Sequence, residues 1–455
     1  MARAGAARGE IQMTEGSLWK NILIFSIPLV FSQLLQVMFN MADVAVVGKF
    51  ASDTALGSVG STSTLVTLFT GFLIGMGNGV NVRVAQHLGA QHREETSRAV
   101  HTAFLLCLLA GLGIMALCLA LAANMLEMLH TKDDLLPGAV LYFRIYALGM
   151  PALGVFNFGN AVLSANGDTK RPLLYLTIAG ILNVILNLFF VIVCKMAADG
   201  VALASVISQY VSAILVVWHM MRLNDACRFR FRELRFHGDE VGRILGLGVP
   251  AGIQHMIFAI ANLFIQAAVN SFDSTMVSGN AAAANTDTII YNIMMAFYTA
   301  CSTFMGQNWG AGHKKRMMDS YLISLFYAFA IAAVLGVAFY FAGRPFLYVF
   351  TNSADVVEAG MQRMKIMCFS YAISAFMDNT IAACRGLGRT IVPTMVVIMG
   401  SCVFRVIWVY TIFAHYHTIP SLYLLYAFSW TITAAAEIVY FLHCFRKLRL
   451  VPETA

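Results

Sequence analysis

The stretch QVMFNMADVAVVGKF, residues 36–50, places the acid Asp43 inside an apolar run that is long enough to cross a bilayer. Gln33, Gln36, Asn40 and Asp43 follow one another in steps of three or four residues, so in a helix they share one face. An ionised acid that faced lipid would cost about 2.5–3.5 kcal/mol even on the lenient insertion scale. We therefore expect this face to meet protein or water, where Asp43 can bind a ligand.

Other apolar stretches carry polar residues that are able to join Asp43. Asn183 and Asn187 lie four residues apart in ILNVILN, and Asn157 lies in VFNFGNAVLSANG. Ser205 lies on the stretch that follows. A carboxylate surrounded by amide and hydroxyl oxygens suits a hard monovalent cation or, alternatively, a shared proton. Each asparagine taken singly is better explained by a hydrogen bond between helices than by a ligand role.

The elements that must position these residues are membrane helices. Of the 455 residues, 59% are hydrophobic and 12% are charged, and the mean hydropathy is +0.73. Soluble domains carry roughly 25% charged residues, and about 20 apolar residues cross a bilayer as a helix. The pattern predicts an all-α polytopic membrane protein with twelve spans, at 20–47, 54–81, 99–122, 139–162, 172–194, 201–221, 244–270, 277–305, 318–341, 358–383, 391–414 and 420–443.

The basic residues predict the orientation of these spans. Most of the 30 Lys and Arg residues fall at the two ends of the chain and in the loops on one side, including the long loop 222–243. The positive-inside rule places both termini and this loop in the cytoplasm. The net charge of +7 then follows from topology, with some attraction to anionic lipid, and we expect no nucleic-acid partner. The polar N-terminus leads straight into the first span, so we expect that span to serve as the insertion signal.

The chain repeats itself at an interval of 221 or 222 residues. The matching pairs are IPLVFSQ (27–33) with VPAGIQH (249–255), AQHLGAQHRE (85–94) with GQNWGAGHKK (306–315), and GDTKRP (167–172) with GRTIVP (388–393). Six spans per repeat give both halves the same orientation, which is a parallel repeat typical of transporters that bind substrate between two lobes. We predict lobes at 1–222 and 244–455, joined by a cytoplasmic linker at 223–243.

In this order, the motifs resemble the multidrug and toxic compound extrusion (MATE) family over nearly the whole chain. The residues that carry the resemblance are Pro28, Asn40 and Asp43 of N-x-x-D, Gln86, Gly89 and Ala90 of Q-x-x-G-A, GQNWGAG at 306–312 and RGLGRT at 385–390. The resemblance implies two six-helix bundles that form a V. It also implies antiport of organic substrates by a monomer in the bacterial inner (cytoplasmic) membrane.

The chain is most similar to the bacterial DNA-damage-inducible branch of the family. The resemblance implies a cation site built from matching residues of spans one, four, five and six, namely Asp43, Asn157, Asn183, Asn187 and Ser205. Asn187 stands where that branch has Asp, and Ser205 stands where it has Thr. The lost charge favours a cycle of one H⁺ or one Na⁺ and disfavours tight binding of Na⁺ at Asp43.

The second half differs from the first at the position of the acid. Asn262 is the repeat partner of Asn40, but Ile265 stands opposite Asp43, so we expect the cation site in the first lobe only. Further residues of polar character are expected to line the substrate cavity. These are Gln33, Gln36, Asn40, His255, Asn262, Asp287 and Asp378.

Two charges inside the second half are predicted to form a buried ion pair. Asp378 and Arg405 are the repeat partners of Asn157 and Asn183, which are expected to meet in the first lobe. The alternative is that Asp378 is a separate protonation site in the cavity, as in the branch of the family that has an acid on the tenth helix. Glu437, near the end of the last span, is expected to reach the membrane interface.

These observations predict a cation-coupled exporter of amphipathic, cationic organic compounds, driven by H⁺ or Na⁺ and without a cofactor. The alternative is a flippase for a lipid-linked oligosaccharide, which shares the architecture. We expect such a flippase to line its cavity with several basic residues, whereas Arg405 is the main basic candidate within a span here. An enzyme is disfavoured, because HExxH, GxSxG and paired catalytic groups are missing from the sequence.

Overall fold

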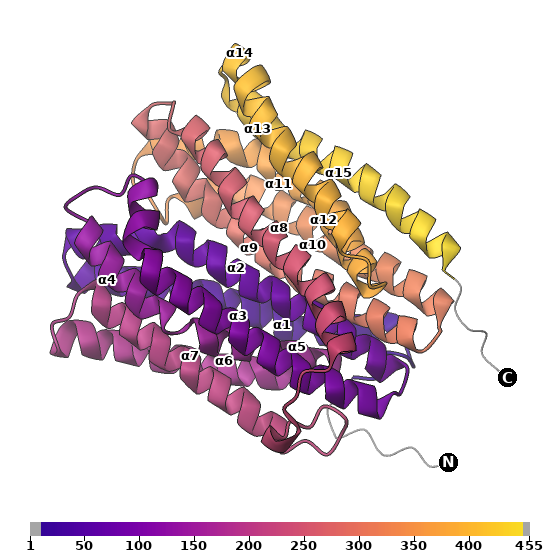
Figure 1. The fold of residues 1–455 in the computed structure, drawn as a ribbon. Coiled ribbons are helices and arrows are strands. Elements are labelled where there is room, and N and C mark those ends of the chain that lie inside the picture. The colour runs from indigo at the N-terminus through magenta and orange to yellow at the C-terminus, as the bar shows by residue number, and fades with distance from the viewer. Residues whose placement is uncertain (1–10, 449–455) are drawn as a thin grey trace. The chain divides into compact units, whose positions relative to one another are not determined.

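In the computed structural model of the protein, residues 11–448 are described, and every regular element within them is a helix (Figure 1). The predicted cytoplasmic ends at 1–10 and 449–455 lie outside the described residues. The helices are α1 (Leu18–Phe50), α2 (Asp53–Gly89), α3 (Arg93–Met128), α4 (Leu136–Ala147), α5 (Met150–Ala165), α6 (Lys170–Leu188), η1 (Phe189–Val193), α7 (Ala198–Met221), η2 (Phe231–Glu233), α8 (Gly238–Val269), α9 (Ser274–Gly310), α10 (Lys314–Leu347), α11 (Ala354–Gly386), α12 (Ile391–Val397), η3 (Ile398–Val403), α13 (Phe404–Trp408), η4 (Val409–Phe413), α14 (Ala414–Tyr416) and α15 (Ile419–Lys447).

The predicted fold of twelve membrane-spanning helices is confirmed. Among the described residues, eleven helices are long and apolar enough to cross a membrane, and the bent pair α4 and α5 forms a twelfth span. The helices run further than the predicted spans; α3, for example, covers Arg93–Met128 where the sequence predicts 99–122. Charged residues end an apolar stretch, but Arg and Glu are good helix formers and continue the helix beyond it.

The predicted fourth span is broken, with a bend of 44° between α4 and α5. Pro151 lies in the first turn of α5 and lacks the N–H that a continuous helix would require there. The break leaves carbonyl groups without helical partners, and the Tyr210 hydroxyl donates a hydrogen bond to the Leu148 carbonyl at 3.0 Å. A side chain at Gly149 would overlap Gln209, so glycine permits the close approach of α7 at this point.

The chain forms two compact units, and each is described by itself. The first unit holds residues 31–256 with the described part of 1–12, and the second holds 13–30 and 257–448. The sequence predicts lobes that keep each helix whole, but α1 and α8 each contribute to both units. α1 is divided because its beginning packs within the second unit. There the ring of Trp19 contacts the rings of Phe326 and Tyr327 edge-on, with ring centres 5.4 and 5.5 Å apart.

In the first unit, α2 packs closely against the beginning of α8 through glycines. A Cβ atom on Gly75 would overlap the backbone of Gly252, and one on Gly79 would overlap that of Gly248. At the end of the same interface, Arg83 of α2 forms a buried ion pair with Glu240 of α8 at 2.6 Å. Small residues that let two backbones touch are typical of membrane helix interfaces.

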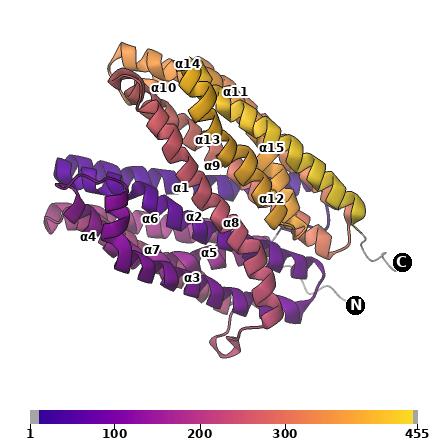
Figure 2. The same cartoon turned by 45° about the horizontal axis from the view of Figure 1, so that its top comes forward.

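In the second unit, α9, α10 and α11 pack together, and α15 packs against α11. The interrupted helix from α12 to α14 runs beside α15 (Figures 1 and 2). Two π-helices, η3 and η4, lie within that interrupted helix. Polar contacts join α10 to α11, since Asn379 donates to the Tyr321 carbonyl at 3.1 Å and Tyr321 hydrogen-bonds Thr380 at 2.9 Å.

The outer surfaces of the helices are apolar. Phe341 of α10 is 79% exposed and Val439 of α15 is 70% exposed, and large hydrophobic residues are exposed on most of the spanning helices. A water-soluble chain rarely leaves so much apolar surface uncovered. The surface therefore supports a bilayer as the solvent of this protein.

Candidate cation-binding site

Asp43 lies in the second half of α1 within the first unit and accepts hydrogen bonds from two neighbouring helices. The side-chain amide of Asn187, near the end of α6, donates to Asp43 Oδ1. The hydroxyl of Ser205, on α7, donates to Asp43 Oδ2 at 3.4 Å. The acid of α1 is therefore held by α6 and α7, and both donors are neutral.

A second pair of hydrogen bonds closes these residues into a ring. Asn187 Nδ2 also donates to Asn183 Oδ1 at 3.2 Å, and Asn183 Nδ2 donates to Ser205 Oγ at 3.3 Å. Asn183 and Asn187 meet because one helical turn separates them on α6. We call Asp43, Asn183, Asn187 and Ser205 the Asp43 ring.

The Asp43 ring offers oxygen atoms and no positive charge. Asn183, Asn187 and Ser205 are buried, and Asp43 is half-buried. Within the described residues, no Lys, Arg or His forms an ion pair with Asp43, and Asn187 Oδ1 has no hydrogen-bond donor. A buried carboxylate without a cationic partner requires compensation by a bound cation or a proton. The free amide oxygen beside it is suited to complete the ligands of such a cation.

Other predicted residues of the first unit form no hydrogen bond with this ring in the described chain. The Asn157 amide donates to the Leu153 carbonyl of its own helix at 3.0 Å, and no hydrogen bond joins Asn157 to Asp43 in the described chain. Gln33 and Gln36 are half-buried on α1, whereas Asn40 is exposed. Their helical spacing places them on the face of Asp43, but spacing alone does not create a contact between helices.

The remaining cavity candidates lie on α8 and α11. His255 is half-buried on α8 and lies beside Gly71 of α2 in the first unit. Asn262 is exposed on the part of α8 that belongs to the second unit. Asp378 is half-buried on α11, also in the second unit. His255 thus belongs to the same unit as Asp43, whereas Asn262 and Asp378 belong to the other unit.

The predicted ion pair between Asp378 and Arg405 is not formed within the described residues. Arg405 Nε instead donates to Ser429 Oγ of α15 at 3.2 Å. Its guanidinium lies 4.5 Å from the ring centre of Tyr426 and 5.5 Å from that of Trp430. The prediction assumed that repeat-related positions make repeat-related contacts, but the long Arg405 side chain reaches α15 and its aromatic rings.

A buried ion pair of the second unit joins Asp287 to Arg363, which lies in the predicted span 358–383. Arg363 of α11 pairs with Asp287 of α9 and also donates to Asn280 Oδ1. The Tyr423 hydroxyl donates to the same Asn280 oxygen. Asp287 is therefore held by an arginine and is not a free acid of a cavity. The sequence held a clue to this pair, because Asp287 and Arg363 both lie within predicted spans, at 277–305 and 358–383. A lone charge inside a span needs a partner.

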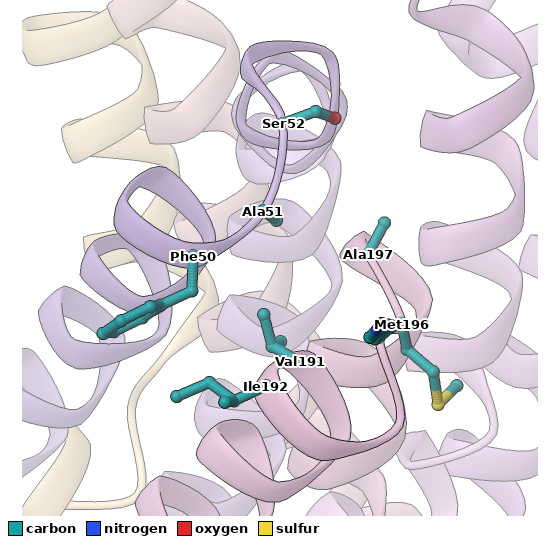
Figure 3. Close-up of a pocket in the computed structure, with 8 residues that line it drawn as sticks. Phe50, Ala51, Ser52, Val191, Ile192, Met196 and Ala197 are labelled. Atoms are coloured by element: carbon teal, nitrogen blue, oxygen red, sulfur yellow. The ribbon is translucent and has the colours of Figure 1, made fainter.

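A cavity of about 520 Å³ opens in the first unit beyond the Asp43 ring (Figure 3). Phe50, Ala51 and Ser52 line it from the end of α1, and Val191 and Ile192 line it from η1. Phe50 follows Asp43 by seven residues, so the cavity lies about 10 Å further along α1. None of the residues predicted to line a cavity belongs to its lining.

Comparison with known proteins relates both halves of the chain to one family. The profile of the MatE family matches residues 28–189 and again residues 250–411. These matches begin 222 residues apart, which agrees with the predicted internal repeat. The chain is 28% identical over 358 residues to "Probable multidrug resistance protein YpnP" of Bacillus subtilis, covering 79% of this chain and 80% of that one.

More distant proteins share the same fold. The chain is 23% identical over 346 residues to "FAD transporter" of Shewanella oneidensis, covering 74% of this chain and 75% of that one. A solved structure described as the outward-facing conformation of a multidrug resistance MATE family transporter of the MOP superfamily matches with a TM-score of 0.90 at 20% identity. That match covers 97% of this chain and 99% of the other. With both halves matched by the family profile, this chain belongs to the multidrug and toxic compound extrusion family of membrane transporters.

Proposed function

We propose that this chain is a cation-coupled antiporter that exports amphipathic, cationic organic compounds across the bacterial inner membrane by alternating access. The family supports a transporter, and relatives named as multidrug resistance proteins support organic compounds as substrates. The protein acts as a monomer, with both termini in the cytoplasm, and Asp43 is the residue that couples the cation to the substrate.

The observation that carries the proposal is the Asp43 ring. A half-buried carboxylate held only by neutral donors can be neutralised by H⁺, by Na⁺ or by a cationic substrate. If the cation and the substrate favour different conformations, binding of one opposes binding of the other. Exchange of the two across the membrane then follows from linkage.

The ring also sets the expected number of coupling ions. Asn187, where the similar branch of the family has an acid, leaves Asp43 as the single carboxylate of the ring. One negative charge is matched by one H⁺ or one Na⁺ per cycle. The two ions differ in what they require, because Na⁺ needs several oxygen ligands such as Asn187 Oδ1, whereas H⁺ needs the carboxylate alone.

Transport from proteoliposomes with ΔpH and ΔNa⁺ imposed separately tests the proposal. With ethidium as the organic cation, we expect one of the two gradients to drive efflux by the wild-type chain. Asp43→Asn keeps the size of the side chain but removes its charge, so we expect the gradient to have no effect on efflux. Asp133→Asn, which changes an exposed acid of the same unit, should behave as wild type. Gradient-driven efflux at the wild-type rate in Asp43→Asn would contradict the mechanism.

A further inference from the structure

A second acid, Glu437, is completely enclosed in the second unit. It lies on α15, ten residues before the end of that helix at Lys447, and its exposed fraction is 0%. Within the described residues, neither Oε1 nor Oε2 has a hydrogen-bond partner. The sequence predicts that this side chain reaches the membrane interface, and its burial corrects that prediction.

An ionised carboxylate in this position would be strongly unfavourable. Buried carboxylates are tolerated when they accept several hydrogen bonds or pair directly with a cation, and within the described residues Glu437 does neither. This environment favours the neutral form of the side chain, which carries a proton. A buried polar group without partners also needs an explanation beyond stability, because an apolar residue of similar size would avoid the loss of hydration.

The groups that face Glu437 come mainly from α11. Cys384 and Arg385, in the last turn of α11, are close enough to interact electrostatically with Glu437. Arg385 also interacts with Asp378, which precedes it by seven residues and thus by two turns on the same helix. Arg385 thus interacts electrostatically with both Glu437 and Asp378.

Among the other elements packed against α15, α10 places the ring of Tyr321 against that of Phe441, one turn beyond Glu437. α12 has no titratable residue, and η3 has only Cys402. Arg405 of α13 bonds Ser429, which lies eight residues before Glu437, about 12 Å away along α15. Tyr410 of η4 follows Arg405 and lies still further along the interrupted helix. On α15 itself, Tyr440 and Cys444 follow on neighbouring turns, and Tyr440 interacts electrostatically with Arg389, which follows α11.

We propose that Glu437 is a proton-binding site of the second unit, separate from Asp43, and that Arg385 is the partner of its deprotonated form. In the present arrangement Glu437 carries the proton. When the proton leaves to solution, the carboxylate remains and pairs with the Arg385 guanidinium, which requires a shift of α15 against α11. The site binds a proton whether or not Asp43 couples export, so it does not rest on the proposed function.

Infrared difference spectroscopy of the purified full chain in nanodiscs tests this site directly. The C=O stretching band of a protonated carboxyl should be present near neutral pH and should be lost in alkaline buffer. We expect Glu437→Gln, which matches the neutral side chain in size, to lose one component of this band. Asp43→Asn should keep that component, and so should Glu358→Gln, which changes an exposed glutamate of α11. A spectrum of Glu437→Gln identical to wild type at every pH would overturn the proposal.

Two further measurements address folding and the role of Arg385. In the unmutated chain, ¹³C at the side-chain carboxyl carbon of glutamate should shift the frequency of the C=O band component assigned to Glu437. A band whose frequency does not change would overturn the assignment without any substitution. Arg385→Gln removes the partner of the ionised form, so the component should persist to a pH higher by about one unit or more, a tenfold change in proton affinity. Loss at an unchanged pH would exclude Arg385 as the partner.

Discussion

Asn187 donates both hydrogens of its amide, one to Asp43 and the other to Asn183, and its oxygen has no donor among the described residues. This one side chain orients the acid of α1 and keeps an oxygen beside it. Asn187 can therefore hold Asp43 in place, at a position where the similar branch has an acid, without adding a charge to the ring. Asn187 therefore determines both the geometry and the net charge of the Asp43 ring.

Asn187→Asp should increase the number of coupling ions. The change places a second carboxylate in hydrogen-bond contact with Asp43, and two such acids do not ionise together without compensation. We expect the ratio of coupling ions to exported substrate to rise from one to two. Parallel measurement of substrate efflux and of H⁺ or Na⁺ flux in the same vesicles gives this ratio. Asn187→Leu, which removes the donor without adding charge, should abolish coupling, and an unchanged ratio in Asn187→Asp would count against the single-charge site.

Arg363→Met should strongly destabilise the second unit. The side chains of Arg363 and Asp287 are 11% and 15% exposed, so the change leaves a buried acid without its cation. Breaking such a pair typically costs about 3–5 kcal/mol. Arg344→Met is the matched control, because the Arg344–Glu358 pair is 65% and 49% exposed and such pairs contribute about 0–1 kcal/mol.

Unfolding of the purified variants by denaturant in detergent measures these differences. The double variant Arg363→Met with Asp287→Asn should recover part of the loss, since it removes the stranded charge. Equal stability of Arg363→Met and Arg344→Met would show that the buried Arg363–Asp287 pair contributes no more to stability than the exposed Arg344–Glu358 pair.

At the scale of elements, the first unit depends on the contact between α2 and the beginning of α8. Gly75 and Gly79 of α2 meet Gly252 and Gly248 of α8, and the Arg83–Glu240 ion pair lies at the end of the same interface. Because the two backbones touch at these glycines, there is no space for a side chain. The first unit thus holds α8 by shape as well as by charge.

Gly75→Ala should destabilise the first unit although alanine favours helices. The added methyl group would overlap the Gly252 backbone, and overpacking of this kind typically costs about 1–3 kcal/mol. Gly60→Ala on the same helix is the control, because a Cβ atom there meets nothing within 4 Å. The control should be neutral or more stable by up to about 1 kcal/mol. Thermal unfolding followed by size-exclusion chromatography compares the two, and equal melting temperatures would contradict the close packing.

At the scale of the whole molecule, each unit contains its own buried acid chemistry. The first unit has Asp43 held by neutral donors. The second has Asp287 paired with Arg363, and Glu437, which accepts no hydrogen bond from the described residues. The family repeat covers both units, yet the acids do not occupy repeat-related positions. The two halves have therefore diverged in charge while they retain the same helical framework.

The orientation of the whole chain can be tested with its native cysteines. Cys194, between η1 and α7, is the exposed thiol among the described cysteines, whereas Cys444 near the end of α15 is half-buried. The positive-inside rule places Cys194 outside the cell and the end of α15 inside. A membrane-impermeant maleimide should label Cys194 in intact cells but not in inverted vesicles. Cys194→Ser should remove the labelling of intact cells, and labelling in inverted vesicles alone would reverse the topology.

Properties that depend on neighbouring residues along the chain were predictable. Hydrophobic length predicted the twelve spans, and the 222-residue interval predicted the repeat that the family profile matches. The spacing of Asn183 and Asn187 placed them on one face, and the structure brings both into the Asp43 ring. Helical periodicity depends on neighbouring residues of one helix, so it does not change with the way that helix packs against others.

Contacts between helices were decided by the tertiary structure. The sequence could not show that Asn157 bonds its own helix, that Arg405 reaches Ser429, or that Asp287 pairs with Arg363. Each contact depends on the rotation and tilt of a helix, which packing against neighbouring helices sets. The sequence by itself thus determined which residues are polar and which helix face they share. The tertiary structure alone decided which of those faces meet, because a side chain finds its partner only after the helices have packed.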